Sequence, residues 1–199
     1  MDLNLGFLAS HNGSNVRAIL ENIAAGELIA KPMVVITNNP DAGVIGVASS
    51  FGVESVCIND KQHSPYPTLD EAILEELLGF DVNLVVLAGY MKPVGQNVIA
   101  KYHNRILNIH PALLPKYGGK GMYGMNVHRA VIASNDKESG ATIHLVDPLY
   151  DDGRILSQAK VERSSTDTPE SLAEKVLRVE HQLYTQVLRR IQRGEITLD

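Results

Sequence analysis

The chain has 199 residues, of which 44% are hydrophobic and 21% are charged, and its formal net charge at pH 7 is -5. This length allows one sizeable core and is short for two ordinary domains. The negative charge argues against a nucleic-acid-binding surface, which usually needs a basic field. No apolar run approaches ~18 residues, so no membrane span is predicted, and the single cysteine, Cys57, excludes an internal disulfide. We therefore expect one cytoplasmic domain.

Through the first hundred residues, short apolar runs alternate with patterns of helical period. Buried strands are predicted at residues 3–9, 33–37, 53–58 and 82–88. Helices follow them, one reaching from Ser14 to a stop at Gly26, one starting at a capping box of Thr68 and Glu71, and one over residues 94–102. The strand at 82–88 is the most apolar and should be central. This alternation predicts an α/β fold with a doubly wound, mostly parallel sheet whose loops open on one edge.

The loop at residues 10–15 lies between the first strand and the first helix. Gly13 allows close backbone approach, Ser14 can cap the helix, and the free first-turn amides favour an anion. These features indicate a phosphate cradle, with a simple helix-capping turn as the alternative. There is no P-loop lysine and no G-x-G-x-x-G motif, so neither a nucleoside triphosphate nor a dinucleotide is indicated.

A second candidate site follows a strand that runs to His110 and should stop there because Pro111 cannot extend it. Side chains two apart on a strand share a face, so Asn108 and His110 point to the same side. Both then lie where a strand meets a loop, the edge at which open α/β sheets bind ligands. The alternative is a polar pair that satisfies itself.

The pattern changes after this strand. Residues 115–124 are rich in Gly and Lys and form either a mobile active-site loop or a plain connection. A helix is predicted at 127–134, then strands at 141–146 and 155–161 joined by an acidic turn at 147–153.

The last predicted element is a long helix. Thr168 and Pro169 form a strong helix start, and the helix continues for about 25 residues to Gly194. Glu180 falls on its inward, apolar stripe. A carboxylate there is costly unless paired, so we expect a partner such as a ligand amine. The alternative is a position at the edge of the stripe, with contact to solvent or to an arginine.

The polar groups of the loop edge suggest a reaction class. An asparagine amide can donate to a developing oxyanion, a histidine can move a proton, and a nearby carboxylate can orient the imidazole. We find no serine or cysteine in an elbow-like context and no His/Cys cluster for a metal. Asn108, His110 and an aspartate of the acidic turn therefore favour direct transfer between two bound substrates, without a metal.

Five segments resemble motifs of the folate-dependent formyltransferases. Residues 108–115, NIHPALLP, resemble the N-[IL]-H-P-S-L-L-P signature of that family. Residues 10–15, 87–91, 151–159 and 180–184 are similar to segments of the branch that formylates phosphoribosylglycinamide. The matches run in order over nearly the whole chain, from residue 7 to 184.

The resemblance implies a Rossmann-like fold with an antiparallel C-terminal extension and a long final helix. It implies one formyltransferase domain over 1–199, with a phosphate-binding half at about 1–100 and a folate and catalytic half at about 101–199. The implied reaction moves the formyl group of 10-formyltetrahydrofolate to the glycine amine of glycinamide ribotide, a step of purine (IMP) biosynthesis. Both substrates are small molecules, no metal, nucleic acid or membrane takes part, and the enzyme is a monomer or homodimer.

The same resemblance implies roles for single residues. Asn108 stabilises the oxyanion, His110 assists proton transfer, and Asp151 orients the imidazole. The residues implied to bind the ribotide are Gly13, Ser14, Asn15, Pro111 and Glu180, and those implied to bind the folate are Tyr90, Met91, Lys92, Pro93, Val94, Val146 and Asp147.

Two alternative functions remain open at this stage. A formyltetrahydrofolate hydrolase or another folate-dependent formyltransferase would carry a similar catalytic set, although the hydrolase and the methionyl-tRNA enzyme usually carry an extra domain. A non-catalytic phosphate- or folate-binding module would not need Asn108, His110 and Asp151 together.

Overall fold

One seven-stranded sheet organises the computed structural model, which describes residues 2–63, 66–148 and 151–198. The strands are β1 (Asn4–Leu8), β2 (Lys31–Thr37), β3 (Glu54–Cys57), β4 (Leu84–Leu87), β5 (Ile106–His110), β6 (Glu138–Leu145) and β7 (Ile155–Glu162). The helices are α1 (Ser14–Ala24), α2 (Gly43–Ser50), α3 (Tyr66–Gly79), α4 (Gln96–Lys101), α5 (Met125–Ser134) and α6 (Pro169–Gln192). Among the described residues, no helix is long and apolar enough to cross a membrane.

The strand order is β3-β2-β1-β4-β5-β6-β7. The first five strands pair in parallel, β6 returns antiparallel to β5, and β7 pairs antiparallel to β6. The four residues of β4 are all buried, and this strand lies in the middle of the sheet. The predicted doubly wound sheet, its central strand and its antiparallel extension are therefore confirmed.

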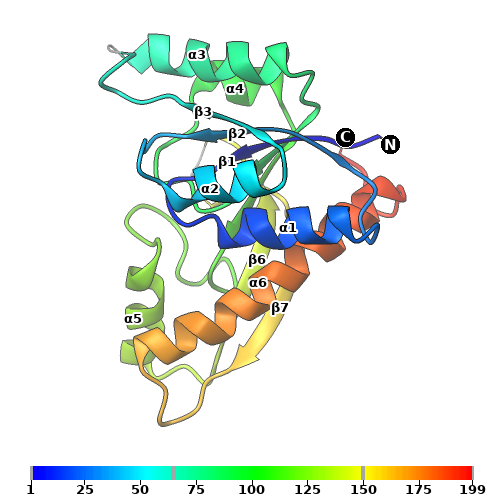
Figure 1. The fold of residues 1–199 in the computed structure, drawn as a ribbon. Helices are drawn as coiled ribbons and strands as arrows, with labels where there is room; N and C mark the ends of the chain where they lie inside the picture. The colour runs from blue at the N-terminus through cyan, green and yellow to red at the C-terminus, as the bar shows by residue number, and fades with distance from the viewer. Residues whose placement is uncertain (1, 64–65, 149–150, 199) are drawn as a thin grey trace.

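Helices cover both faces of the sheet and enclose two hydrophobic clusters. The larger cluster includes residues of α1, α2, α5 and α6, and the smaller one includes residues of α3 and α4. Figure 1 shows α3 and α4 together on one side, with α1 and α6 crossing on the other. Hydrophobic burial on both faces explains why the inner strands read as continuous apolar runs.

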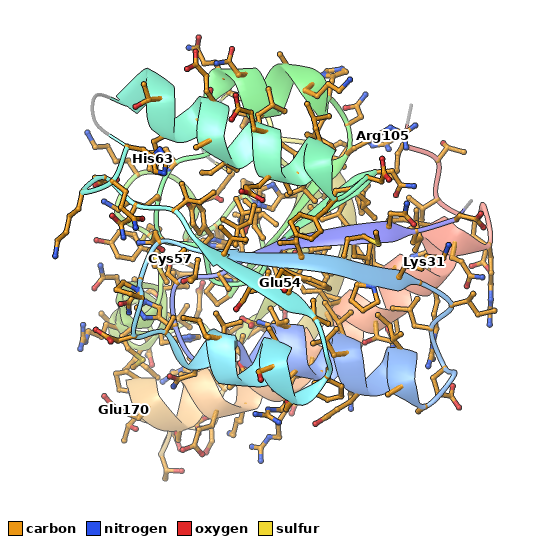
Figure 2. The ribbon with its side chains drawn as sticks, turned by 45° about the horizontal axis from the view of Figure 1, so that its top comes forward. Lys31, Glu54, Cys57, His63, Arg105 and Glu170 are labelled. Carbon is orange, nitrogen blue, oxygen red and sulfur yellow. The ribbon has the colours of Figure 1, made fainter. Side chains whose placement is uncertain are left out.

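The parallel strands all run toward one edge. In Figure 2, Lys31 marks the amino end of β2 on the right, and Cys57 marks the carboxyl end of the outer strand β3 on the left. The loops after β1 and β4 meet at this edge, because Ser10 donates its N–H to the Gly89 carbonyl at 3.1 Å and Met91 donates its N–H to Ser10 Oγ at 2.8 Å. These contacts lie at the point where the strand order reverses, between β1 and β4.

Two predicted helix caps are wrong. Gly13, not Ser14, is the N-cap of α1; it has φ +70°, and no side chain caps the helix. A Cβ at Gly13 would lie 2.4 Å from Val44 Cγ2, so packing against α2 selects glycine there. Helix α3 begins at Tyr66, which places Thr68 inside the helix.

Helix α4 is short and its first turn depends on a buried carboxylate. Asp70, only 4% exposed, accepts the Asn97 N–H at 2.8 Å and the Val98 N–H at 3.3 Å. A Cβ at Gly95 would lie 2.0 Å from Asp70 Cγ, so this close approach requires glycine. Asp70 therefore ties α3 to the start of α4 through charge-assisted bonds.

Helix α6 begins as predicted and packs along the sheet. Thr168 and Ser171 form a reciprocal capping box, with Pro169 at the first helical position. Further along, the fully buried Tyr184 donates its hydroxyl to the Leu87 carbonyl at 2.7 Å and lies 3.1 Å from the Leu107 carbonyl. The helix is thereby attached to the carboxyl end of β4 and to the first residues of β5.

Candidate active site

The antiparallel pairing of β5 and β6 builds a polar face. Asn108 lies opposite His144, and His110 lies opposite Thr142. Their neighbours along the two strands turn to the other face and join the larger hydrophobic cluster; these are Leu107, Ile109, Ile143 and Leu145. Alternation along two neighbouring strands therefore places four polar side chains together beside the strand ends.

The structure brings the three predicted catalytic residues together. Asp151 Oδ2 lies 3.6 Å from His110 Nδ1, and Asp151 Oδ1 lies 3.5 Å from His144 Nε2. Asn108 Nδ2 lies 3.1 Å from His144 Nε2. Residues 149–150 of the acidic turn lie outside the described residues, but Asp151 is described and accepts the Gly119 N–H at 2.9 Å.

The ring of His110 has a defined orientation. Its Nε2 lies 2.7 Å from the Tyr117 carbonyl, which only accepts, so Nε2 carries a hydrogen. In the neutral ring, Nδ1 then holds the lone pair and faces Asp151. Burial lowers the pKa of His110, against the opposing effects of the Asp151 charge and the Tyr117 carbonyl. A neutral imidazole with a free Nδ1 is a competent proton acceptor near pH 7.

His144 was not predicted, although it contacts both Asn108 and Asp151. Its Nδ1 lies 2.9 Å from the Leu145 carbonyl and must donate there, and in the neutral ring Nε2 then accepts from the Asn108 amide. Burial alone raises the pKa of the Asp151 carboxyl, but the contact with His144 and the Gly119 N–H outweigh it and lower the pKa on balance. Asp151 is therefore a stable anion between two imidazoles.

Thr142 was also missed, and it organises the turn after His110. Its hydroxyl donates to the Ala112 carbonyl at 2.6 Å and accepts from the Leu114 N–H at 3.0 Å. Gln158 Nε2 lies 2.9 Å from the same oxygen and 2.8 Å from the Leu114 carbonyl. These bonds fix the backbone that follows the half-buried Pro111.

The predicted anion cradle lies at the start of α1. Gly13 is buried in a left-handed conformation, Ser14 opens the helix, and Asn15 is 7% exposed. Backbone N–H groups of a first turn without a side-chain cap, together with the positive end of the helix dipole, suit a phosphate.

Asn15 also joins the cradle to Glu180 on α6. Asn15 Nδ2 donates to Glu180 Oε2 at 2.8 Å, and both residues are more than nine-tenths buried. Burial raises the pKa of Glu180 to about 7, and the bond from Asn15 opposes this only in part. Asn15 Oδ1 is buried without a hydrogen-bond partner among the described residues. The predicted inward position of Glu180 is confirmed. This buried pair holds two acceptor groups, the Glu180 carboxyl and the Asn15 amide oxygen.

The residues expected to bind the folate divide into two sets. Tyr90, Val94 and Val146 are partly buried and pack against the smaller hydrophobic cluster. Met91, Lys92 and Pro93 are exposed, with Lys92 Nζ 2.7 Å from Asp60 Oδ2. Asp147 follows Val146 and is half-buried. Val146 lies next to the start of β5, because its N–H donates to the Ile106 carbonyl at 2.9 Å.

A sequence signal for the missed residues did exist. Thr142 and His144 are two apart in the predicted strand 141–146, whose other residues are apolar, and this is the same spacing as that of Asn108 and His110. Had the two strands been paired as neighbours, these residues would have fallen on one face. The contacts of Tyr117 and Gly119 use backbone atoms and left no such signal.

Comparisons with known proteins agree with this geometry. The profile of the family described as "Formyl transferase" matches residues 3–188. The phosphoribosylglycinamide formyltransferase of Bacillus subtilis is 32% identical over 94% of this chain and 95% of its own length. The chloroplastic phosphoribosylglycinamide formyltransferase of Arabidopsis thaliana is 41% identical over 92% of this chain, which spans 63% of that protein's length.

Solved structures have the same fold as this chain. Glycinamide ribonucleotide transformylase 1 from Symbiobacterium toebii superposes with a TM-score of 0.93 at 32% identity, covering 100% of this chain and 91% of that one. A formyltetrahydrofolate deformylase from Pseudomonas syringae pv. tomato superposes with a TM-score of 0.89 over 99% of this chain and 63% of that one, at 20% identity. The latter likeness concerns the fold alone.

Proposed function

The chain belongs to the formyl transferase family, and on that premise we propose that it transfers the formyl group of 10-formyltetrahydrofolate to the glycine amine of phosphoribosylglycinamide. The observation that carries this proposal is the position of Asp151 between His110 and His144, beside the Asn108 amide. The relatives named phosphoribosylglycinamide formyltransferase support the choice of substrates. The reaction would supply the formylated ribotide to purine biosynthesis.

In the proposed mechanism, the glycine amine attacks the formyl carbon attached to N10 of the folate. One N–H of the Asn108 amide is engaged by His144, and the other is available to the oxyanion of the tetrahedral intermediate. His110 takes the amine proton through Nδ1, directly or through water, and delivers it to the departing folate nitrogen. Asp151 stabilises the imidazolium that forms and orients it, since the newly protonated Nδ1 faces its carboxylate.

The ribotide would lie between the cradle and this catalytic group. Its phosphate would accept from the backbone N–H groups around Gly13, Ser14 and Asn15. Glu180 would pair with the glycinamide end, where a substrate N–H or ammonium would compensate the buried carboxylate. Pro111, next to His110, would line the path between the two ends.

The formylfolate would enter from the other side. Tyr90, Val94 and Val146 would pack against the pterin, since apolar side chains favour contact with a flat ring. Met91, Lys92 and Pro93 would contact its outer part, and Asp147 would offer an acceptor for the ring N–H groups. The N-terminal half, about 1–100, would thus bind the phosphate and add residues 90–94 to the folate site, and the rest would supply the other folate contacts and the catalytic group. A monomer or homodimer and a cytoplasmic location stay predictions.

The test is a turnover assay with both substrates. The expected result is formation of formylated glycinamide ribotide and tetrahydrofolate in equal amounts. Omission of the ribotide serves as the control, because release of formate without it would indicate a hydrolase. Binding of both substrates without any product would refute the enzyme proposal in favour of a binding module.

A further inference from the structure

Tyr117 has a backbone conformation that is unfavourable for an aromatic residue. Its φ is +58°, in the left-handed region that L side chains seldom adopt. The residue stands in a loop where Gly119 and Gly121 also have positive φ, for which glycine is suited. Such a conformation persists only where surrounding contacts hold it, and it is common at functional sites.

The contacts that hold Tyr117 come from its phenol. The hydroxyl donates to Asp136 Oδ2 at 2.7 Å and lies 2.5 Å from Ser134 Oγ. Lys116 Nζ contacts the same Asp136 oxygen at 2.9 Å, and the Tyr117 ring packs against the larger hydrophobic cluster. The phenol is therefore fastened to the end of α5 and the residues that lead into β6. We call this group of Tyr117, Ser134 and Asp136 the phenol anchor.

The backbone of the same loop contacts both proposed catalytic side chains. The Tyr117 carbonyl accepts from His110 Nε2 at 2.7 Å, and the Gly119 N–H donates to Asp151 Oδ2 at 2.9 Å. The carbonyl decides which ring nitrogen carries the hydrogen, because an acceptor at Nε2 leaves Nδ1 with the lone pair. A shift of this carbonyl would release the ring from its orientation without altering any catalytic side chain.

We propose that Tyr117 is a positioning residue for the formyl transfer, and that the phenol anchor holds its carbonyl against His110 and so fixes the Nε2–H form of the ring. The expected effect on kcat rests on the proposed function. The expected tautomer of His110 does not. Tyr117 touches no reacting atom in this scheme. It acts through His110, whose Nδ1 is thereby kept toward Asp151 and the substrates.

The kinetic test is Tyr117→Phe, which removes the hydroxyl and keeps the ring in the hydrophobic cluster. We expect kcat to fall roughly tenfold, within the range that small losses of orientation cost, and KM for both substrates to stay within about twofold. Tyr123→Phe is the matched control, because Tyr123 stands in the same loop with 59% of its surface exposed. A kcat for Tyr117→Phe within about twofold of the wild-type value would overturn the proposal.

Two variants of the anchor make the test specific. Asp136→Ala removes the acceptor of the phenol and should lower kcat as Tyr117→Phe does, and the double variant should be no slower than either single one. Asp136→Asn keeps an acceptor oxygen and should restore most of the activity. Additive losses in the double variant would show that the phenol and Asp136 act separately, which would refute the anchor.

A measurement without turnover separates this inference from the proposed function. The imidazole ¹⁵N spectrum of the wild-type protein should show His110 in the Nε2–H form, with the signal assigned by its loss in His110→Gln. In Tyr117→Phe the two nitrogens should move toward a mixture of both tautomers. Unchanged nitrogen shifts would overturn the inference even if the wild type is active, whereas an inactive wild type with the expected shifts would refute only the proposed function.

Discussion

Replacing Glu180 by glutamine should make the protein more stable at alkaline pH. Glu180 is 8% exposed, and its oxygen accepts from Asn15 at 2.8 Å. Glutamine has nearly the same shape and keeps an acceptor for Asn15, so the change removes the charge and little else. The wild-type protein must either bury that charge or keep the carboxyl protonated.

The magnitude follows from the raised pKa of Glu180, about 7 in place of 4.5. Since the pKa is higher in the folded state, the stability contributed by the protonated carboxyl is fully present below about pH 4.5 and is lost as the pH rises through about 7. At about 1.4 kcal/mol per pH unit, the full loss is about 3 kcal/mol. Glu180→Gln does not undergo this loss. The free energy of unfolding of the variant should therefore exceed that of the wild type by about 1 kcal/mol near pH 5 and by about 3 kcal/mol near pH 8.5.

The assay is urea unfolding of both proteins at these two pH values. Comparison of the variant with the wild type cancels the titration of all other groups. Glu174→Gln, at an exposed position of the same helix, is the control and should show no such growth. A difference in unfolding free energy between Glu180→Gln and wild type that is equal at both pH values would refute the reasoning, because it would mean that the pKa of Glu180 is the same in the folded and unfolded states.

Three further predictions concern single side chains. His110→Ala should lower turnover by roughly 100-fold or more, the usual scale of general acid–base assistance, and unchanged turnover would remove His110 from the mechanism. Asp70→Ala should lower the free energy of unfolding by about 1–2 kcal/mol, because two N–H groups of α4 lose their acceptor; a urea midpoint equal to that of the wild type would contradict this. Gly13→Ala should lower the free energy of unfolding by about 1–3 kcal/mol, because of strain at φ +70° and contact with Val44. The same variant should bind phosphate more weakly, as measured by calorimetry. Wild-type stability in that variant would show that the turn relaxes freely.

The parallel half of the fold could be predicted from the sequence because each strand and each helix has its own local pattern of apolar residues. The apolar runs and helical periods of residues 3–102 are local, and right-handed crossovers leave few arrangements for them. The start of α1 could not be assigned locally. A serine after a glycine favours Ser14 as the cap, but the close packing of Gly13 against Val44 of a second helix makes Gly13 the cap instead.

The candidate site was predictable only where its residues are close in sequence or belong to a motif. Asn108 and His110 share a face by strand alternation alone, and Asp151 came from the resemblance. The opposing pair Thr142 and His144 depends on the register of two strands separated by a loop and a helix, and no local pattern sets that register. The backbone of Tyr117 opposes local preference, so only the finished tertiary contacts reveal it.

The pairing of β5 with β6 limits how the sequence around this site can evolve. The loss of one residue ahead of Thr142 would exchange the two faces of β6, sending Thr142 and His144 into the hydrophobic cluster and Ile143 toward the substrates. Such a deletion would damage folding and catalysis in a single event. Length changes can therefore accumulate only in the connections, such as the glycine-rich loop, while the two strands accept only replacement of one side chain by another. Divergence of this enzyme is expected to show as loops of varied length around two strands of constant length.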